Sequence, residues 1–138
     1  MVLDLGGSGI FGVEFFVDKK GAVIFSELSP RPHDTGMVTM FTQNYSQFDI
    51  HARVLTGMPL PEIKLMQAGA SHVILAEENA TGNYTIEGIE KALEDENVDF
   101  RIFGKPTLKS YRRMGVVLAP SLDKAQKAAK KISVISKE

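Results

Sequence analysis

Two apolar runs separated by a polar turn occupy residues 11–28. The turn, Asp18-Lys19-Lys20-Gly21, has the composition of a β-hairpin connection. We therefore predict that the two runs are strands that pair antiparallel. In such a hairpin Glu14, the only charged residue of its run, lies nearly opposite Glu27.

The pattern then changes to helical spacing. Ser46 is a suitable helix N-cap, and apolar side chains recur at three- and four-residue intervals from Phe48 to Leu55. A glycine and two prolines follow within the next six residues. We therefore predict a helix that begins after Ser46 and ends at Gly57, followed by a linker that starts at Met58.

The second half of the chain alternates between strand-like and helical segments. The predicted strands are 70–76, 98–103 and a buried strand that is entered through a turn within 111–119, and the predicted helices are 86–93 and 121–132. The second helix has an apolar face and a lysine-rich face, which is typical of a helix that packs on one side.

Composition narrows the class of protein. The chain has 138 residues, of which 43% are hydrophobic and 24% are charged, as in a globular protein. A net charge of −1 gives no electrostatic reason to expect nucleic acid or a membrane surface as a partner. Cysteine is absent, which excludes disulfides and thiolate metal sites and is compatible with a cytoplasmic location.

The segment 27–36, Glu-Leu-Ser-Pro-Arg-Pro-His-Asp-Thr-Gly, contains most of the candidate chemistry. Its two prolines restrict the backbone, so the polar groups between and after them belong to a rigid loop. Opposed carboxylates at Glu14 and Glu27 repel each other unless a cation lies between them, and Mg²⁺ with a bound phosphate suits that position. Arg31 could then bind the same phosphate. Alternatively, the two glutamates are solvated residues of a hairpin face, and Arg31 pairs with Asp34.

A second group of charges is basic. Lys105 lies in a Gly-Lys-Pro turn, and Arg112 and Arg113 lie at the start of a predicted strand. If the flanking strands pair, the three cations come together and form an anion site that suits a phosphate. Scattered surface charge is the alternative.

The segment 27–36 resembles the metal and phosphate loop of ATP-grasp enzymes. It is most similar to that of the formate-dependent phosphoribosylglycinamide formyltransferases of purine biosynthesis, and the segments 9–16, 101–106 and 112–116 agree with the same family. The resemblance implies an α+β protein. Residues 1–60 would form the C-terminal part of an ATP-grasp domain, with antiparallel strands and a helix, and residues 61–138 a small α/β C-terminal domain.

The resemblance also implies roles for individual residues. Glu14 and Glu27 match the ligands of the Mg²⁺ ion that bridges the phosphates of ATP, the co-substrate. Arg31 matches the catalytic cation that stabilises the transferring phosphoryl group. Asp34 matches a residue that holds glycinamide ribonucleotide near its amine.

Three further positions are implied to bind substrate: Lys105, Arg112 and Arg113 match residues that bind the phosphate of glycinamide ribonucleotide. Formate is the other substrate, and the family is usually homodimeric. The implied reaction passes through formyl phosphate and gives the formylated nucleotide, ADP and phosphate. One position departs from the wider superfamily: Ser29 stands where Asn is common.

Two alternatives stay open. The ATP-grasp carboxylase of the same pathway, N5-carboxyaminoimidazole ribonucleotide synthetase, has a similar loop, but His-Asp-Thr-Gly at 33–36 and the Arg112-Arg113 pair favour the formyltransferase. A non-catalytic dimerisation or docking module is the other. The family's N-terminal substrate domain and ATP-clamping lysines match nothing in this sequence, so we expect the 138-residue chain alone to be inactive.

Overall fold

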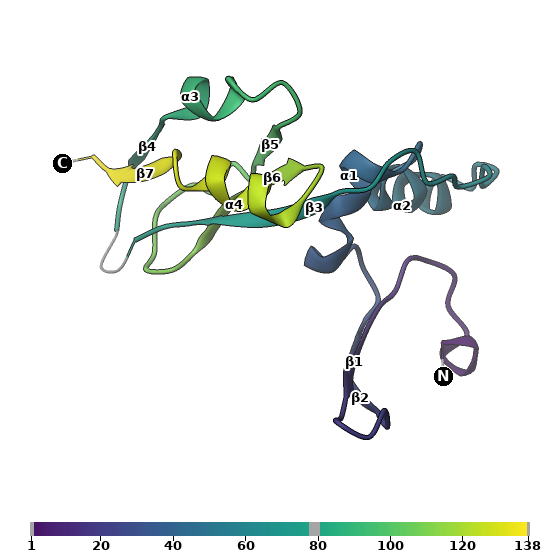
Figure 1. Ribbon diagram of the computed structural model, residues 1–138. Helices are drawn as coiled ribbons and strands as arrows, with labels where there is room; N and C mark the ends of the chain where they lie inside the picture. The colour runs from purple at the N-terminus through teal and green to yellow at the C-terminus, as the bar shows by residue number, and fades with distance from the viewer. Residues whose placement is uncertain (1, 78–80, 138) are drawn as a thin grey trace. The chain divides into compact units, whose positions relative to one another are not determined.

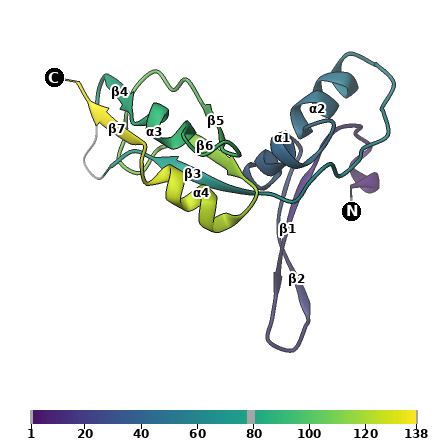
Figure 2. The same ribbon diagram turned by 45° about the horizontal axis from the view of Figure 1, so that its top comes forward.

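The computed structural model describes residues 2–77 and 81–137. Its chain divides into two compact units, Met1–Met66 and Gln67–Glu138, which we call the N-terminal unit and the C-terminal unit and describe separately (Figures 1 and 2). Among the described residues, none of the helices has the length and apolar character needed to span a membrane.

The N-terminal unit consists of a hairpin followed by short helices. Its elements in chain order are the 3-10 helix η1 (Leu3–Leu5), the strands β1 (Gly12–Val17) and β2 (Val23–Ser29), the 3-10 helix η2 (Asp34–Val38), and the helices α1 (Thr39–Thr42) and α2 (Gln47–Leu55). The predicted hairpin is confirmed, because β1 and β2 pair antiparallel.

The turn between β1 and β2 is closed by its own residues. One carboxylate oxygen of Asp18 accepts hydrogen bonds from the backbone N–H groups of Lys20 and Ala22, each at 2.8 Å. Gly21 has a φ of 82°, a left-handed conformation that glycine adopts without a steric penalty. The turn composition therefore fixes the hairpin register locally.

The hairpin exposes apolar side chains on both faces. Phe15, Phe16, Ile24 and Phe25 are each between 46% and 65% exposed, and the rings of Phe15 and Phe25 meet edge to face at 6.2 Å. A two-stranded hairpin that buries so little apolar surface has little stability of its own. It is suited to pairing or packing with additional structure.

Helix α2 begins as the sequence predicts. The Ser46 hydroxyl accepts a hydrogen bond from the Asp49 N–H, and the Asp49 carboxylate accepts one from the Ser46 N–H, which forms a capping box. Its last residue is Leu55, and Gly57 follows in a left-handed conformation, with φ 66°. The predicted helix is confirmed.

The C-terminal unit is built from antiparallel strands and two helices. Its elements are β3 (Ala70–Leu75), β4 (Tyr84–Glu87), α3 (Ile89–Leu93), β5 (Asp99–Ile102), β6 (Arg113–Ala119), α4 (Leu122–Ala129) and β7 (Ser133–Ser136). One sheet has the strand order β3-β6-β5, and β4 pairs with β7 (Figure 1). The predicted strands at 70–76, 98–103 and 111–119 correspond to β3, β5 and β6 and are confirmed.

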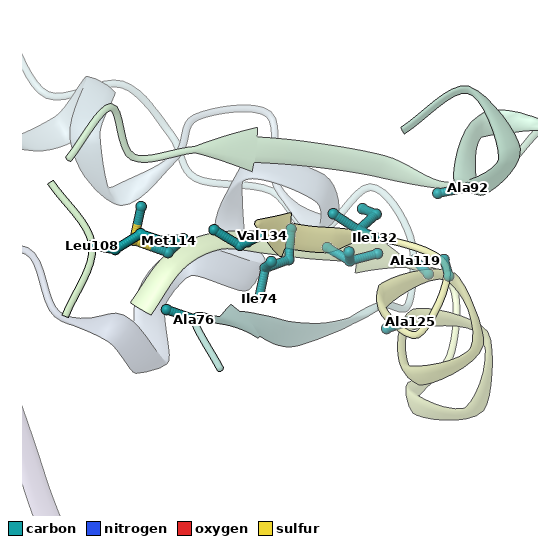
Figure 3. Close-up of a cluster of buried hydrophobic side chains, with 11 residues drawn as sticks. Ile74, Ala76, Ala92, Leu108, Met114, Ala119, Ala125, Ile132 and Val134 are labelled. Atoms are coloured by element: carbon teal, nitrogen blue, oxygen red, sulfur yellow. The ribbon is translucent and has the colours of Figure 1, made fainter. Parts of the chain in front are cut away.

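The C-terminal unit contains a continuous hydrophobic core. Met114, Val117 and Leu118 of the central strand β6 are fully buried, and α4 packs against β3 and β6. Figure 3 shows the buried cluster to which Met114 belongs, with side chains from the strands and from α4. The buried cluster is formed by Ile74, Ala76, Ala92, Leu108, Met114, Val117, Ala119, Ala125, Ala128, Ile132 and Val134.

Two sequence predictions in this unit are wrong in part. Ile86 was expected in a helix, but it lies in β4, where its partner is Val134 of β7. The final helix was expected to reach Ile132, but it ends at Ala129 and the chain continues into β7. Both errors have one cause: β4 and β7 are four-residue strands that pair across about fifty residues of sequence, and local periodicity does not report such pairing.

Candidate functional site

Glu14 and Glu27 lie directly opposite each other in the hairpin. The register pairs Gly12 with Ser29 and Glu14 with Glu27, and shifts by one residue immediately after Glu14. Such a register shift changes the direction of the side chains near the end of the paired strands. The two carboxylates are partly exposed, at 39% and 52%, so they face an accessible surface of the hairpin.

The imidazole of His33 lies between the two carboxylates. Its Nε2 is 3.1 Å from Glu27 Oε1, and its Nδ1 is 3.4 Å from Glu14 Oε1 and 3.2 Å from the Thr35 hydroxyl. A carboxylate only accepts hydrogen bonds, and each ring nitrogen has one within reach, so a protonated Nε2 donates to Glu27 and a protonated Nδ1 faces Glu14.

Gly12 makes the approach of His33 possible. A Cβ atom at position 12 would lie 2.7 Å from the His33 Cβ, a distance that carbon atoms do not tolerate. The His33 side chain is only 13% exposed as a result. The sequence analysis assigned His33 no role in the site, because local patterns do not predict the path of the proline-containing loop. The one indication in the sequence was that His33 belongs to the polar segment 27–36.

These three side chains fit a divalent cation. One ligand atom from each of Glu14, Glu27 and His33 lies within 4.8 Å of the others. Two carboxylates are the donors that Mg²⁺ prefers, with further positions filled by water or phosphate oxygens. Ser29 contacts the same group, since its hydroxyl donates to Glu27 Oε1 at 3.3 Å. This bond makes Ser29 a neighbour of a candidate ligand.

The other predicted residues of the loop have separate surroundings. Arg31 is exposed, and its guanidinium donates to the carbonyl of Pro32 at 3.0 Å. Asp34 is half-buried and is the first residue of η2. Both therefore belong to the loop that follows the Glu27 end of the hairpin, within the N-terminal unit.

The three predicted cations of the C-terminal unit lie on the connection between β5 and β6 and at the start of β6. Lys105 and Arg112 fall between β5 and β6, and Arg113 is the first residue of β6. The strands on either side pair antiparallel, and Phe103 N–H continues the ladder by donating to the Met114 carbonyl at 2.9 Å. The strands that flank Lys105 and Arg112 therefore pair, which is the condition that the sequence analysis set for an anion site.

This connection is held by residues that the sequence analysis did not single out. The Tyr84 hydroxyl donates to the Lys105 carbonyl at 2.6 Å, and Leu108 N–H donates to the Gly82 carbonyl at 2.8 Å. Within the connection, Arg112 Nη1 donates to the Thr107 carbonyl at 2.9 Å. These bonds order the backbone around Lys105 and Arg112.

Family models match most of the chain. Residues 1–48 match the ATP-grasp domain, and residues 69–135 match the family described as PurT, C-terminal. The solved structures that resemble the chain include N5-carboxyaminoimidazole ribonucleotide synthetase from Thermotoga maritima. That protein is 34% identical with a TM-score of 0.87, over 99% of this chain and 40% of that one.

A second solved structure is glycinamide-RNase-transformylase T from Mycobacterium tuberculosis. It is 27% identical with a TM-score of 0.67, over 94% of this chain and 33% of that one. The structural comparison thus finds both enzyme classes that the sequence analysis weighed.

Among curated relatives, formyltransferases are more than 50% identical to this chain in sequence. The formate-dependent phosphoribosylglycinamide formyltransferase of Trichormus variabilis is 52% identical over 96% of this chain, and that of Francisella tularensis is 56% identical over 83%. The chain spans 35% and 29% of these relatives' lengths. Residues 1–48 and 69–135 therefore match the ATP-grasp domain and the PurT C-terminal family, and the chain as a whole is similar to the C-terminal part of formate-dependent phosphoribosylglycinamide formyltransferases.

Proposed function

We propose that this chain supplies the metal-binding and substrate-binding C-terminal part of an enzyme that formylates glycinamide ribonucleotide with formate and ATP. The observation that carries the proposal is the Glu14–Glu27 pair, held opposite each other with His33 between them in a chain 52% identical to a formyltransferase. A cytoplasmic location and a homodimeric assembly accompany the proposal.

Each site residue has a proposed role. Glu14 and Glu27 would hold Mg²⁺, which when bound offsets the negative charge of the ATP phosphates. Arg31 would stabilise the phosphoryl group as it passes from ATP to formate. Asp34 would hold the nucleotide near the amine that attacks formyl phosphate.

The substrate phosphate is assigned to the basic residues of the C-terminal unit. Lys105 and Arg112 on the ordered connection and Arg113 at the start of β6 offer an ammonium and two guanidinium groups, and guanidinium groups bind phosphate with paired N–H donors. The net charge of the whole chain is −1, so this group is a local feature and not part of a generally basic surface.

The carboxylase remains the second candidate, because a structure of that class superposes with a TM-score of 0.87. Its identity of 34% is well below the 52% and 56% of the formyltransferases. Asp34-Thr35 and Arg112-Arg113 also agree with the formyltransferase pattern.

Binding to the 138-residue chain tests the proposal directly. We would titrate the chain calorimetrically with glycinamide ribonucleotide and with 5-aminoimidazole ribonucleotide, with and without Mg²⁺-ADP. We expect the glycinamide compound to bind more tightly, and Arg112→Ala/Arg113→Ala to weaken it at least about tenfold, as expected for loss of charged hydrogen bonds. The matched control, Lys127→Ala/Lys130→Ala in α4 and at its C-cap, removes the same charge and should leave the affinity within about twofold.

Turnover is tested in a chimera in which this chain replaces the matching third of the Trichormus variabilis enzyme. We expect ADP formation that requires formate and glycinamide ribonucleotide together. Turnover with bicarbonate and 5-aminoimidazole ribonucleotide would instead establish the carboxylase. Absence of both activities in a folded chimera, with no nucleotide binding by the chain, would favour a non-catalytic module.

A further inference from the structure

The loop that contains His33 is held from behind by a buried amide. Gln47, the first residue of α2, is only 8% exposed. Its Nε2 donates to the His33 carbonyl at 2.8 Å, and its Oε1 accepts from the His33 N–H at 2.9 Å. Both ends of the amide are therefore used on the backbone of one residue, which fixes the position of that residue in two directions.

Thr39 completes the attachment. Its hydroxyl donates to the Gly36 carbonyl at 2.6 Å and accepts from the Gln47 N–H at 2.9 Å. The loop is thus bonded at residue 33 and again at residue 36, on either side of Asp34 and Thr35. We call Gln47 and Thr39 together the loop clamp.

The clamp also explains a glycine. A Cβ atom at Gly36 would overlap the Oε1 and Cδ atoms of Gln47. Gly36 has no left-handed conformation that would require glycine for another reason. The close approach of the loop backbone to the Gln47 amide is therefore what excludes a side chain at position 36.

His33 connects the clamp to the carboxylates. Its backbone is bonded to Gln47, whereas its ring lies 3.1 Å from Glu27 and 3.4 Å from Glu14. Residues that hydrogen-bond to metal ligands set the orientation of those ligands, and their loss commonly weakens metal binding. A displacement of the His33 backbone would carry the imidazole away from Glu27.

From this geometry we propose that Gln47 and Thr39 are positioning residues that hold His33, and through it the Glu14–Glu27 pair, in the arrangement that binds a divalent cation. The proposal rests on the proposed function, because it assumes that the carboxylate pair binds a cation. It adds that the metal affinity depends on two residues that do not contact the metal.

The test measures Mn²⁺ binding to the full 138-residue chain by electron paramagnetic resonance of the free ion. We expect Gln47→Leu, which removes both bonds to His33 at similar volume, to raise the Kd for Mn²⁺ about tenfold, the lower end of the effect of losing a ligand-orienting bond. Thr39→Val is nearly isosteric and should raise it about threefold, since it removes one donor to the loop. It also tests the clamp if Gln47→Leu does not fold.

The matched control is Asp49→Ala, which breaks the capping box in the same turn of α2 without touching the loop. We expect its Kd to stay within about twofold of wild type. An equal loss in Asp49→Ala and Gln47→Leu would overturn the positioning role and assign the effect to helix stability.

The remaining outcomes separate the two proposals. Tight Mn²⁺ binding that is unchanged in folded Gln47→Leu and Thr39→Val would overturn the positioning role and leave the proposed metal site standing. If wild type binds no Mn²⁺, and Glu27→Gln is indistinguishable from it, both the metal site and the clamp's role are overturned. Amide hydrogen exchange at His33 provides the independent readout of whether each variant releases the loop.

Discussion

Glu27 lies beside three other side chains of the site. It faces Glu14 across the hairpin, lies 3.1 Å from His33 Nε2 and accepts from the Ser29 hydroxyl at 3.3 Å. An ionised carboxylate carries a negative charge and only accepts hydrogen bonds. A neutral amide of the same shape would keep the volume and lose that charge.

We therefore predict that Glu27→Gln in the Trichormus variabilis chimera lowers kcat at least about 100-fold, the scale of losing charge stabilisation in a transition state. The melting temperature should change little, because Glu27 is half exposed at 52%. Steady-state turnover and a thermal melt provide the two measurements. Glu62→Gln, an exposed glutamate in the same unit, is the matched control, and a near-normal kcat in Glu27→Gln would remove this residue from the metal site.

At the residue scale, the sequence predicted the carboxylate pair but not what organises it. The turn at 18–21 predicts the hairpin and places Glu14 nearly opposite Glu27. The register that continues from the turn would pair Glu14 with Ser26, and the one-residue shift after Glu14, which composition does not predict, brings Glu27 opposite it. The positions of His33 and Gln47 could not be predicted from the sequence, because they depend on how the loop after Pro32 folds back onto α2. No local periodicity encodes such a contact across fourteen residues.

At the scale of elements, helix α2 positions Gln47 and depends on its N-terminal capping box. The Asp49 carboxylate accepts from the Ser46 hydroxyl at 2.7 Å and from the Ser46 N–H at 2.8 Å. The hydroxyl bond, followed by the backbone bond, holds the pKa of Asp49 below its ordinary value. The ionised form is therefore the one that the folded state favours.

The sign of the pH dependence follows from this shift. A carboxyl with a lowered folded pKa contributes stability that is present above its unfolded pKa, about 3.9, and is lost as the pH falls through the folded value. We predict that Asp49→Ala is less stable than wild type by about 1 kcal/mol at pH 7, a typical capping contribution, and that the difference shrinks below about pH 4. Urea unfolding at pH 7, 5 and 3 measures this, and a difference that stays constant would contradict it.

The elements themselves divide into those with local signals and those without. Ser46 and Ser121 mark the starts of α2 and α4 because capping is a local interaction, and the strand β6 is recognisable from its apolar run. The strand β7 has four residues, of which only Val134 is buried. Its pairing with β4 is a tertiary interaction that a sequence pattern of this length does not specify.

At the scale of the whole molecule, buried apolar residues are concentrated in the C-terminal unit. All eleven residues of the hydrophobic cluster belong to residues 67–138, whereas the hairpin of the N-terminal unit leaves its phenylalanines about half exposed. Stability of a small unit depends chiefly on the apolar surface that it buries. The basic residues of the proposed phosphate site are thus placed on a unit with its own core.

We predict that a fragment of residues 67–138 folds cooperatively by itself and that its core side chains account for this. Met114→Ala should destabilise the fragment by about 2–5 kcal/mol, since it removes a fully buried side chain from the central strand and leaves a cavity. Leu122→Ala, at a residue 53% exposed, is the control and should cost less than about 1 kcal/mol. Urea unfolding followed by circular dichroism measures the free energy of unfolding of both variants. The absence of a cooperative transition in the fragment, or an equal loss of stability in the two variants, would show that the cluster does not act as an independent core.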